Sequence, residues 1–395
     1  MENRIKFNLE IPNDIKLIHR IFIDNGFKLF IVGGSVRDAL LGEIPKDWDL
    51  ATDAIPDKVE DMMEKANLRT LATGKAFGVI NVFTEDNEFE IATFREDVFN
   101  EPTLDGRRPD SVTFTTIEGD VLRRDLTINA LFFDLGTSEI VDLVGGVDDL
   151  KNGIIRTVGN AENRFNEDRL RILRAIRFAA RFSNGLHSGI IDALGKDSGL
   201  NGISAERIRD EFLKGLKSAN STVFFLEMLD SFNLFDWIFP NMVVNKKFIE
   251  DKDPIVVLAT LLKNHEWVKL RKDLNKLTFS TSEIKAIELL TALHKLDIDT
   301  AVMFKNIFKN SGVSSDQLRN FGSREGIPSQ LLAAFEEFEL SVNGDEVMKE
   351  FNLKPSKELG DKIKELETNN FKKLLGISWF IPEGLVYLYI NNLKR

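Results

Sequence analysis

The order of apolar and polar positions divides the chain into a mixed first part and a helical remainder. Residues 1–150 contain short runs rich in Val, Ile, Phe and Thr, which favour strands, between stretches with helical spacing. The polar segment 95–110, which contains Pro and Gly, predicts a long mobile loop. Strands are therefore expected at 28–32, 78–84, 88–94, 112–116 and 130–134, and helices at 12–26 and 35–41.

After about residue 160 the strand signals fade, and apolar residues recur at helical spacing, as at Leu170, Leu173 and Ile176. The predicted fold class is an α+β head with a mixed or antiparallel sheet, followed by an all-helical remainder. Further helices are expected at 204–217, 221–232, 254–263 and 282–295, and on to the C-terminus.

Composition restricts the classes of protein that need to be considered. A chain of 395 residues is too long for one simple core, so two to four domains are expected. The absence of cysteine excludes disulfides, thiolate zinc sites and a cysteine nucleophile, and it suits a reducing cytoplasm. Because the sequence shows neither a signal peptide nor an apolar stretch that could span a bilayer, we expect a cytoplasmic protein without a membrane partner.

Charge is distributed unevenly along the chain. The net charge of −11 argues mildly against a nucleic-acid partner, because phosphate binding requires a positive surface. Residues 151–181, however, contain eight basic and three acidic side chains, which gives this stretch a local charge of +5. A basic strip on an acidic chain favours a protein that binds a polyanion at one defined place.

The first candidate for chemistry follows the first predicted strand. Gly33 and Gly34 end that strand and would let backbone N–H groups approach a phosphate, at the start of a helix that carries Arg37. Asp47 and Asp49 are two residues apart, which on a strand places both carboxylates on one face. Such a pair can share two Mg²⁺ ions that activate an attacking hydroxyl and stabilise a leaving pyrophosphate. A turn with solvated aspartates is the alternative interpretation.

The second candidate is the run Arg-Arg-Asp-Leu-Thr-Ile-Asn-Ala at 123–130. The guanidinium of an arginine such as Arg124 suits triphosphate oxygens, and the amide of Asn129 suits a ribose hydroxyl. The start of a charged helix is the alternative interpretation of this run.

The third candidate is the pair Asp168 and Arg171, which are i and i+3 neighbours on a predicted helix. A salt bridge on a solvated face is the usual explanation of such a pair. The pair could also read a nucleobase, because cytosine and adenine both present an amine beside an unprotonated ring nitrogen. A carboxylate accepts from the amine while a guanidinium donates to the ring nitrogen, whereas guanine and uracil present the opposite order.

Together these motifs resemble those of the class II tRNA nucleotidyltransferases, the CCA-adding enzymes of the DNA polymerase beta superfamily. The resemblance covers about residues 30–215 and five motifs in the family's order, two further ones being 142–149 and 206–214. It implies addition of CCA to tRNA 3′ ends from CTP and ATP without a nucleic-acid template. The implied cofactor is Mg²⁺, with two ions in the catalytic complex.

The resemblance also implies roles for individual residues. Asp47 and Asp49 would be catalytic and would bind the metal ions, and Asp168 and Arg171 would select the base. The residues expected to bind the nucleotide are Gly33, Gly34, Arg37, Arg124, Asp125, Asn129, Asp168, Arg171, Arg174 and Arg177.

The implied architecture is an elongated seahorse with four parts, the last two helical and gripping tRNA. The expected domains are a nucleotidyltransferase head at 1–150, a helical neck for nucleotide selection at 151–217, a helical body at 218–310 and a tRNA-binding tail at 311–395.

Related activities stay open. Bacterial poly(A) polymerases share the head and neck, but segment 73–79 looks like the CCA-adding version and lacks an arginine-rich run. The loop after Phe94, with Arg107 and Arg108, favours full CCA addition over CC addition. No residue excludes an A-adding enzyme. An inactive tRNA-binding module is the alternative of a different class, and the intact Asp-x-Asp motif argues against it.

Overall fold

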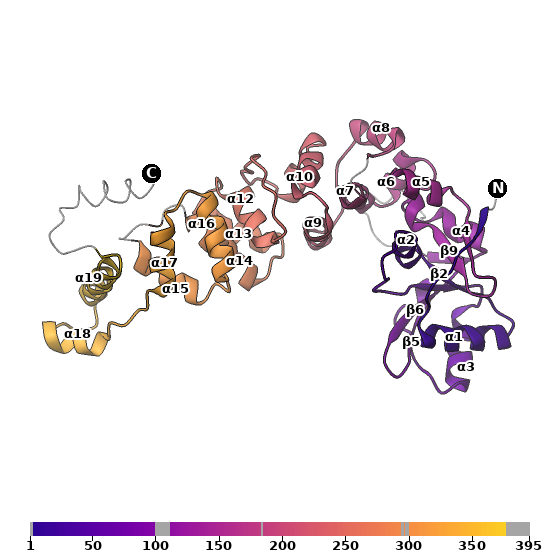
Figure 1. Cartoon of the computed structure of the whole chain (residues 1–395), viewed down its shortest axis with the longest axis horizontal. Coiled ribbons are helices and arrows are strands. Elements are labelled where there is room, and N and C mark those ends of the chain that lie inside the picture. The colour runs from indigo at the N-terminus through magenta and orange to yellow at the C-terminus, as the bar shows by residue number, and fades with distance from the viewer. Residues whose placement is uncertain (1–2, 99–110, 183–184, 294–295, 297–299, 377–395) are drawn as a thin grey trace. The chain divides into compact units, whose positions relative to one another are not determined.

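The computed structural model describes residues 3–98, 111–182, 185–293, 296 and 300–376 (Figure 1). The chain forms two compact units, Met1–Leu234 and Phe235–Arg395. The N-terminal unit contains the sheets and ten helices of the described residues, and the described part of the C-terminal unit is helical. This arrangement confirms the predicted fold class. Among the helices described, none is long and apolar enough to cross a membrane.

An eight-stranded mixed sheet forms the centre of the N-terminal unit. Its strand order is β1-β10-β9-β2-β3-β6-β5-β4, and neighbouring strands are antiparallel except for β3 and β6. β7 and β8 form a separate two-stranded ribbon. The strands are β1 (Asn3–Lys6), β2 (Leu29–Val32), β3 (Leu50–Thr52), β4 (Arg69–Leu71), β5 (Val79–Phe83), β6 (Glu88–Thr93), β7 (Arg95–Val98), β8 (Ser111–Phe114), β9 (Leu131–Asp134) and β10 (Glu139–Asp142).

Helices cover the sheet and continue the chain. The described helices of the N-terminal unit are α1 (Asn13–Asp24), α2 (Gly34–Leu40), α3 (Pro56–Lys65), α4 (Ile117–Leu122), α5 (Gly146–Asn152), α6 (Ala161–Glu167), α7 (Leu170–Phe182), α8 (Ser188–Lys196), α9 (Ala205–Ser218) and α10 (Thr222–Ser231), with 3-10 turns η1 (Lys75–Phe77) and η2 (Thr127–Asn129).

The C-terminal unit has its own apolar core, which includes the fully buried rings of Phe321, Phe335 and Phe371. Its described helices are α11 (Phe235–Ile238), α12 (Pro254–Leu262), α13 (Trp267–Lys276), α14 (Thr281–Ala292), α15 (Ala301–Lys309), α16 (Ser315–Arg324), α17 (Ser329–Glu337), α18 (Gly344–Phe351) and α19 (Lys357–Leu374). The predicted helices at 204–217, 221–232, 254–263 and 282–295 correspond to α9, α10, α12 and α14.

Strand β2 is buried on both faces, which explains its uninterrupted apolar run. Leu29 and Ile31 point into the core that α1 and α3 cover, whereas Phe30 and Val32 point into a second core on the opposite face. Because alternate residues of a strand face opposite sides, all four positions must be apolar. The strand is thereby fixed in the middle of the sheet, and its C-terminal end has a defined position.

The chain directly after β2 positions the first motif. Gly33 has a φ of 69°, a backbone conformation that favours glycine, and it turns the chain into α2. The prediction that Asp47 and Asp49 lie on a strand is wrong, because β3 begins at Leu50. Asp49 is nevertheless held beside the end of β2, since the N–H of Val32 donates to its carbonyl at 2.9 Å.

The predicted loop at 95–110 is partly wrong as well. Its first four residues form β7, which pairs with β8 in the register Arg95 to Phe114. The remaining residues, 99–110, lie outside the described part of the chain, including the expected loop residues Arg107 and Arg108. The sequence also gave no prediction for β1, β4, β10, α3, α4 and α5. The division into four domains stays a prediction.

Candidate active site

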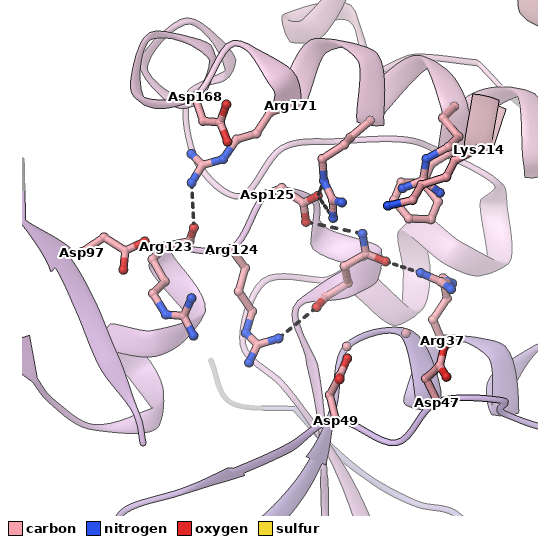
Figure 2. Close-up of a pocket in the computed structure, with 16 residues that line it drawn as sticks. Arg37, Asp47, Asp49, Asp97, Arg123, Arg124, Asp125, Asp168, Arg171 and Lys214 are labelled. Carbon is pink, nitrogen blue, oxygen red and sulfur yellow. Dashed lines mark hydrogen bonds and ion pairs between the residues drawn. The ribbon is translucent and has the colours of Figure 1, made fainter. Parts of the chain in front are cut away.

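A cavity of about 680 Å³, called here the central cavity, lies within the N-terminal unit (Figure 2). It brings together all twelve residues that the sequence predicted for the site, although they come from four separate stretches of the chain. The described residues that line it are Gly33, Gly34, Arg37, Asp47, Asp49, Asp97, Arg123, Arg124, Asp125, Asn129, Asp168, Arg171, Arg174, Arg177, Phe178 and Lys214.

Asp47 and Asp49 lie together at one end of the central cavity (Figure 2). The hydroxyl of Ser35 donates to the backbone carbonyl of Asp47 at 2.8 Å, which ties the chain at Asp47 to the start of α2. Both residues are exposed and line the cavity. The surrounding protein desolvates Asp49, and this raises the pKa of its carboxyl. The charge of Asp47 also raises this pKa, whereas the charge of Arg124 lowers it.

This carboxylate pair fits a divalent cation. Within the described residues, neither carboxylate has a hydrogen bond or ion pair that would compensate its charge. Two adjacent carboxylates in that condition are the oxygen ligands that Mg²⁺ prefers. No group of three or more acidic or histidine side chains in the described chain could hold a metal ion. Further ligands would therefore come from the substrate or from water.

A buried carboxylate, Asp120 of α4, orients the arginines of the second motif. Its oxygens accept from Arg124 at 2.9 Å and from Arg123 at 2.8 Å, and it has no exposed surface. Burial acts to raise the pKa of Asp120, but the charges of Arg124 and Arg123 outweigh it, and the pKa lies below its usual value. The guanidinium of Arg124 also lies 4.6 Å from the ring centroid of Phe132.

Asn129 connects the elements that surround the cavity. Its side-chain oxygen accepts from Arg37 of α2, and its side-chain nitrogen donates to Asp125 at 3.4 Å. Asp125 accepts in turn from Arg174 of α7 at 2.7 Å. Burial acts to raise the pKa of Asp125, but its interactions with the positive charge of Arg174 and other groups outweigh burial. The pKa therefore lies below its usual value, and the group stays a carboxylate. The result is a polar chain, Arg37–Asn129–Asp125–Arg174, across the site (Figure 2).

Asp168 and Arg171 lie together at the other end of the central cavity (Figure 2), but the predicted i, i+3 helix pair is wrong. Asp168 precedes the first residue of α7, and its carboxylate accepts from the N–H of Leu170 and from Arg207 of α9, both at 2.9 Å. Arg171 donates to Glu167 at 2.6 Å.

Backbone carbonyls complete the hold on Arg171. Its guanidinium donates to the carbonyl of Arg123 at 3.1 Å and to that of Arg164 at 3.2 Å. No ion pair joins Asp168 to Arg171 among the described contacts. Each of the two side chains is therefore held by its own partners rather than by the other.

The aromatic ring of Phe178, on the wall formed by α7, lies close to two cations. The guanidinium of Arg177 lies 4.1 Å from its centroid and that of Arg37 lies 5.0 Å from it. Arg177 also pairs with the buried Glu211 of α9. These contacts join α2, α7 and α9 into one wall of the cavity.

Sequence reasoning did not assign Asp97, Arg123, Phe178 and Lys214 to the site, although Arg123 begins the motif at 123–130. Phe178 follows Arg174 by four residues, so the helical face that carries the arginines could have indicated it. Lys214 ends the motif at 206–214, although its spacing gave it no role. Asp97 lay in the segment predicted as a loop, and nothing in its pattern indicated that β7 carries it to the cavity.

Comparison with known proteins decides the family. Residues 29–156 match the model of the poly A polymerase head domain, and residues 197–244 match that of a probable RNA and SrmB-binding site of polymerase A. The CCA-adding enzyme of Ligilactobacillus salivarius is 33% identical over 370 residues, which cover 87% of this chain and 88% of that enzyme. The chain belongs to the CCA-adding enzyme family. These are the class II tRNA nucleotidyltransferases that the motifs predicted.

A second CCA-adding enzyme matches over nearly its whole length, whereas a poly(A) polymerase matches over little more than half of its own. The CCA-adding enzyme of Streptococcus sanguinis is 33% identical over 399 residues, which cover 93% of this chain and 94% of that enzyme. The poly(A) polymerase I of Salmonella typhi is 34% identical over 263 residues, but these cover 64% of this chain and 55% of the polymerase.

Solved structures support the fold over most of the chain. The CCA-adding enzyme of Bacillus stearothermophilus in complex with CTP has a TM-score of 0.67 at 22% identity, covering 96% of this chain and 98% of that one. The Thermotoga maritima enzyme complexed with tRNA has a TM-score of 0.64 at 20% identity, covering 96% and 95%. At such identities the likeness concerns the fold alone.

Proposed function

We propose that this protein adds CCA to the 3′ ends of tRNA, using CTP and ATP without a nucleic-acid template. The observation that carries the proposal is the order of groups along the central cavity. The carboxylate of Asp168 and the guanidinium of Arg171 lie at one end, an amide and arginines in the middle, and a carboxylate pair at the other end. That order matches the base, the ribose and the phosphates of a nucleotide.

The base would lie against Asp168 and Arg171. Two acceptor positions of Asp168 are occupied by Leu170 and Arg207, and a carboxylate offers about four, so the amine of cytosine or adenine can still be bound. Arg171 has five N–H donors, of which three have partners among the described residues. A remaining donor can reach the unprotonated ring nitrogen. Guanine and uracil would place a carbonyl against the carboxylate and an N–H against the guanidinium, so neither contact with the base could form.

The ribose and the phosphates would lie between the two ends. The amide of Asn129 suits the ribose hydroxyls, and Arg124 supplies a guanidinium beside the carboxylate pair. Gly33 and Gly34 carry no side chains, which leaves their backbone accessible to phosphate oxygens. Arg174 and Arg177 add positive charge along α7, with Asp125 fixing the first of them.

The chemistry is transfer of a nucleotidyl group to the RNA terminus. The 3′-oxygen of the RNA forms a bond to the α-phosphorus, the bond from that phosphorus to the bridging oxygen breaks, and pyrophosphate leaves with the electron pair. Asp47 and Asp49 are the residues that would hold two Mg²⁺ ions, which when bound activate the hydroxyl and stabilise the leaving group.

The cytoplasmic location expected from the sequence remains part of this proposal.

Incorporation onto three tRNA transcripts tests the proposal. The transcripts end at the discriminator base, at C and at CC, and CTP and ATP are supplied separately and together. We expect addition of C, C and A to the shortest transcript, and A alone to the CC-ending transcript when ATP is the single nucleotide.

Other outcomes would favour the alternatives. Because poly(A) polymerase I is among the relatives, a long A tail would assign the chain to that activity. Addition of A to the CC-ending transcript, with no addition of C to the two shorter transcripts, would make it an A-adding enzyme. No product on any transcript would favour a tRNA-binding module.

A further inference from the structure

A second cavity, of about 470 Å³ and called here the Trp48 cavity, lies in the N-terminal unit outside the central cavity. Its wall is formed by the segment 7–12 after β1, by the end of α2 with the following segment 42–45, and by Trp48. The two cavities have no described lining residue in common. The volume lies within the range of roughly 300–1,000 Å³ that is usual for sites of small ligands.

Trp48 stands between the two carboxylates of the proposed metal site, yet it belongs to a different cavity. Asp47 and Asp49 line the central cavity and Trp48 does not, whereas Trp48 lines the second cavity and neither aspartate does. The chain at 47–49 therefore separates the two cavities. A group bound in the Trp48 cavity would lie beside the proposed place of bond formation, across this short segment.

A third cavity, of about 500 Å³, adjoins both of the others along the segment after α2. It shares the carboxylate pair with the central cavity, and it shares Glu43 and Ile44 with the Trp48 cavity. Two exposed lysines, Lys46 and Lys217, also line it. The three cavities thus form a path from the carboxylate pair to the Trp48 cavity, and the lysines make this path suitable for part of a polyanion.

The lining of the Trp48 cavity is mostly apolar. Ile44 has the greatest exposed fraction of any large apolar side chain described, 89%. The other apolar members of the wall include Phe7, Leu9, Ile11, Pro45 and Trp48. The described lining residues include no lysine or arginine, and the charged ones are Glu10 and Glu43. A phosphate is therefore disfavoured, whereas an uncharged group with an apolar surface is favoured.

The base at the 3′ end of an RNA is such a group, and it must lie close to the carboxylate pair. It is attached to the same ribose as the attacking 3′-oxygen, and the central cavity is taken by the incoming nucleotide. During CCA addition this base is first the discriminator base, then C and then C again. A site that reads hydrogen bonds would suit one base, whereas an apolar wall with an aromatic ring accepts any, because every base has a π-face.

We propose that the Trp48 cavity binds the base of the 3′-terminal nucleotide of the RNA that is being extended, by stacking on Trp48 and apolar contact with Ile44. This proposal rests on the proposed CCA addition, because that reaction brings an RNA terminus to the carboxylate pair. The bound base would hold its ribose so that the 3′-oxygen points towards the carboxylate pair. After each addition the new terminal base would replace the previous one in the cavity.

Equilibrium binding of two RNAs that differ in the terminal base alone tests the site in the full chain, without CTP or ATP. One is a tRNA transcript that ends at CC. The other carries an abasic nucleotide at its last position, which keeps the ribose and the 3′-hydroxyl. The wild type should bind the intact transcript about tenfold more tightly, as expected for one stacked base. Trp48→Leu should reduce this preference to about twofold, because it keeps an apolar side chain and removes the ring.

Ile44→Ala is the second variant, because Trp48 also packs against the core whereas Ile44 is exposed. It should reduce the preference for the intact transcript to about threefold, since part of the apolar contact is lost. Binding of the abasic transcript should stay within about twofold of wild type in both variants. Ile23→Ala, at a half-exposed position of α1 outside the three cavities, is the matched control and should keep the full preference.

Equal binding of the two transcripts by the wild type would overturn the proposal, and so would an equal loss of both in the two variants. A wild-type dimer in light scattering that Ile44→Ala converts to a monomer would also overturn it, by assigning the cavity to a second copy. If the preference depends on Trp48 and Ile44 but the wild type adds no CCA, the proposed function fails and the base site stands. If CCA is added without any preference, the proposed function stands and the base site fails.

Discussion

The two ends of the central cavity differ in how their charges are held. Asp47 and Asp49 have no compensating partner among the described residues, whereas Asp168 and Arg171 are each fixed by several contacts. Uncompensated carboxylates are costly to the fold and are suited to receive cations. Groups held in place at the other end are suited to distinguish ligands by the direction of their donors and acceptors. One end is thus prepared for chemistry and the other for recognition.

The largest expected effect is at the carboxylate end. Asp49→Asn should lower the rate of single-turnover CTP incorporation by about 10⁴-fold, because it removes one of two metal-binding carboxylates. The variant should be as stable as the wild type, since desolvation already disfavours the ionised form of Asp49. Asp86→Asn, in the exposed turn between β5 and β6, is the control. A large fall in melting temperature together with the lost activity would contradict the comparison.

Asp120→Asn should affect stability rather than chemistry alone. Its carboxylate is fully buried between Arg123 and Arg124, so the variant leaves two arginines without their shared partner. We expect a loss of about 3–4 kcal/mol in the free energy of unfolding, measured by urea denaturation. A loss below about 1 kcal/mol would show that the arginines find other partners.

The same group predicts a pH dependence. The folded pKa of Asp120 lies below its ordinary value of 3.8, so its stabilisation is complete above that pH and is lost as the pH falls towards the folded value. As the pH falls below about 4, the wild type should therefore lose more stability than Asp120→Asn. Parallel pH profiles for the two proteins would contradict the assignment.

Changes at the recognition end should alter selectivity more than rate. Asp168→Ala or Arg171→Ala should reduce the preference for CTP and ATP over UTP and GTP by about 10- to 100-fold, because the variant no longer opposes a wrong base with a mismatched acceptor or donor. The ratio of kcat/KM values for the four nucleotides on one tRNA transcript measures this effect. An unchanged ratio would remove the pair from base selection.

The smallest effect is expected at Arg207, which contacts Asp168 and would act through it. Arg207→Ala should reduce the same selectivity about fivefold, since Asp168 retains its bond from the N–H of Leu170. Arg207→Lys should recover part of the loss, which a general destabilisation would not explain. Arg209→Ala is the control, because Arg209 pairs with its neighbour Asp210 on the same helix.

The residues that line the site were predicted more accurately from the sequence than the contacts that hold each of them in place. Local spacing marked Asp47 with Asp49 and Asp168 with Arg171 as two candidate pairs, and the resemblance to the family assigned both pairs to one site. The contact between Asp168 and Arg207 was not predicted, since it joins a residue between α6 and α7 to one on α9, 39 positions further along the chain. Arg171 pairs with Glu167, four residues before it, instead of with Asp168 as expected. Asp168 lies outside a helix, because α6 ends at Glu167.

The strands show the same division. β2 was predicted because both of its faces are buried and its run is continuously apolar. β7 reads Arg-Glu-Asp-Val, and its polar residues gave no strand signal, although its pairing with β8 carries Asp97 to the cavity. Pairing with a distant strand overrode the local preference of those four residues.

The polar chain Arg37–Asn129–Asp125–Arg174 has a consequence for how this protein can vary over evolutionary time. Each member satisfies the next, so replacing one of them alone would leave a buried donor or acceptor unbonded. Substitutions at these four positions are therefore expected to arise together or not at all. A set of homologous sequences would record that coupling as correlated replacement, whereas Lys46 and Lys217, which no described side chain holds, could change independently of it.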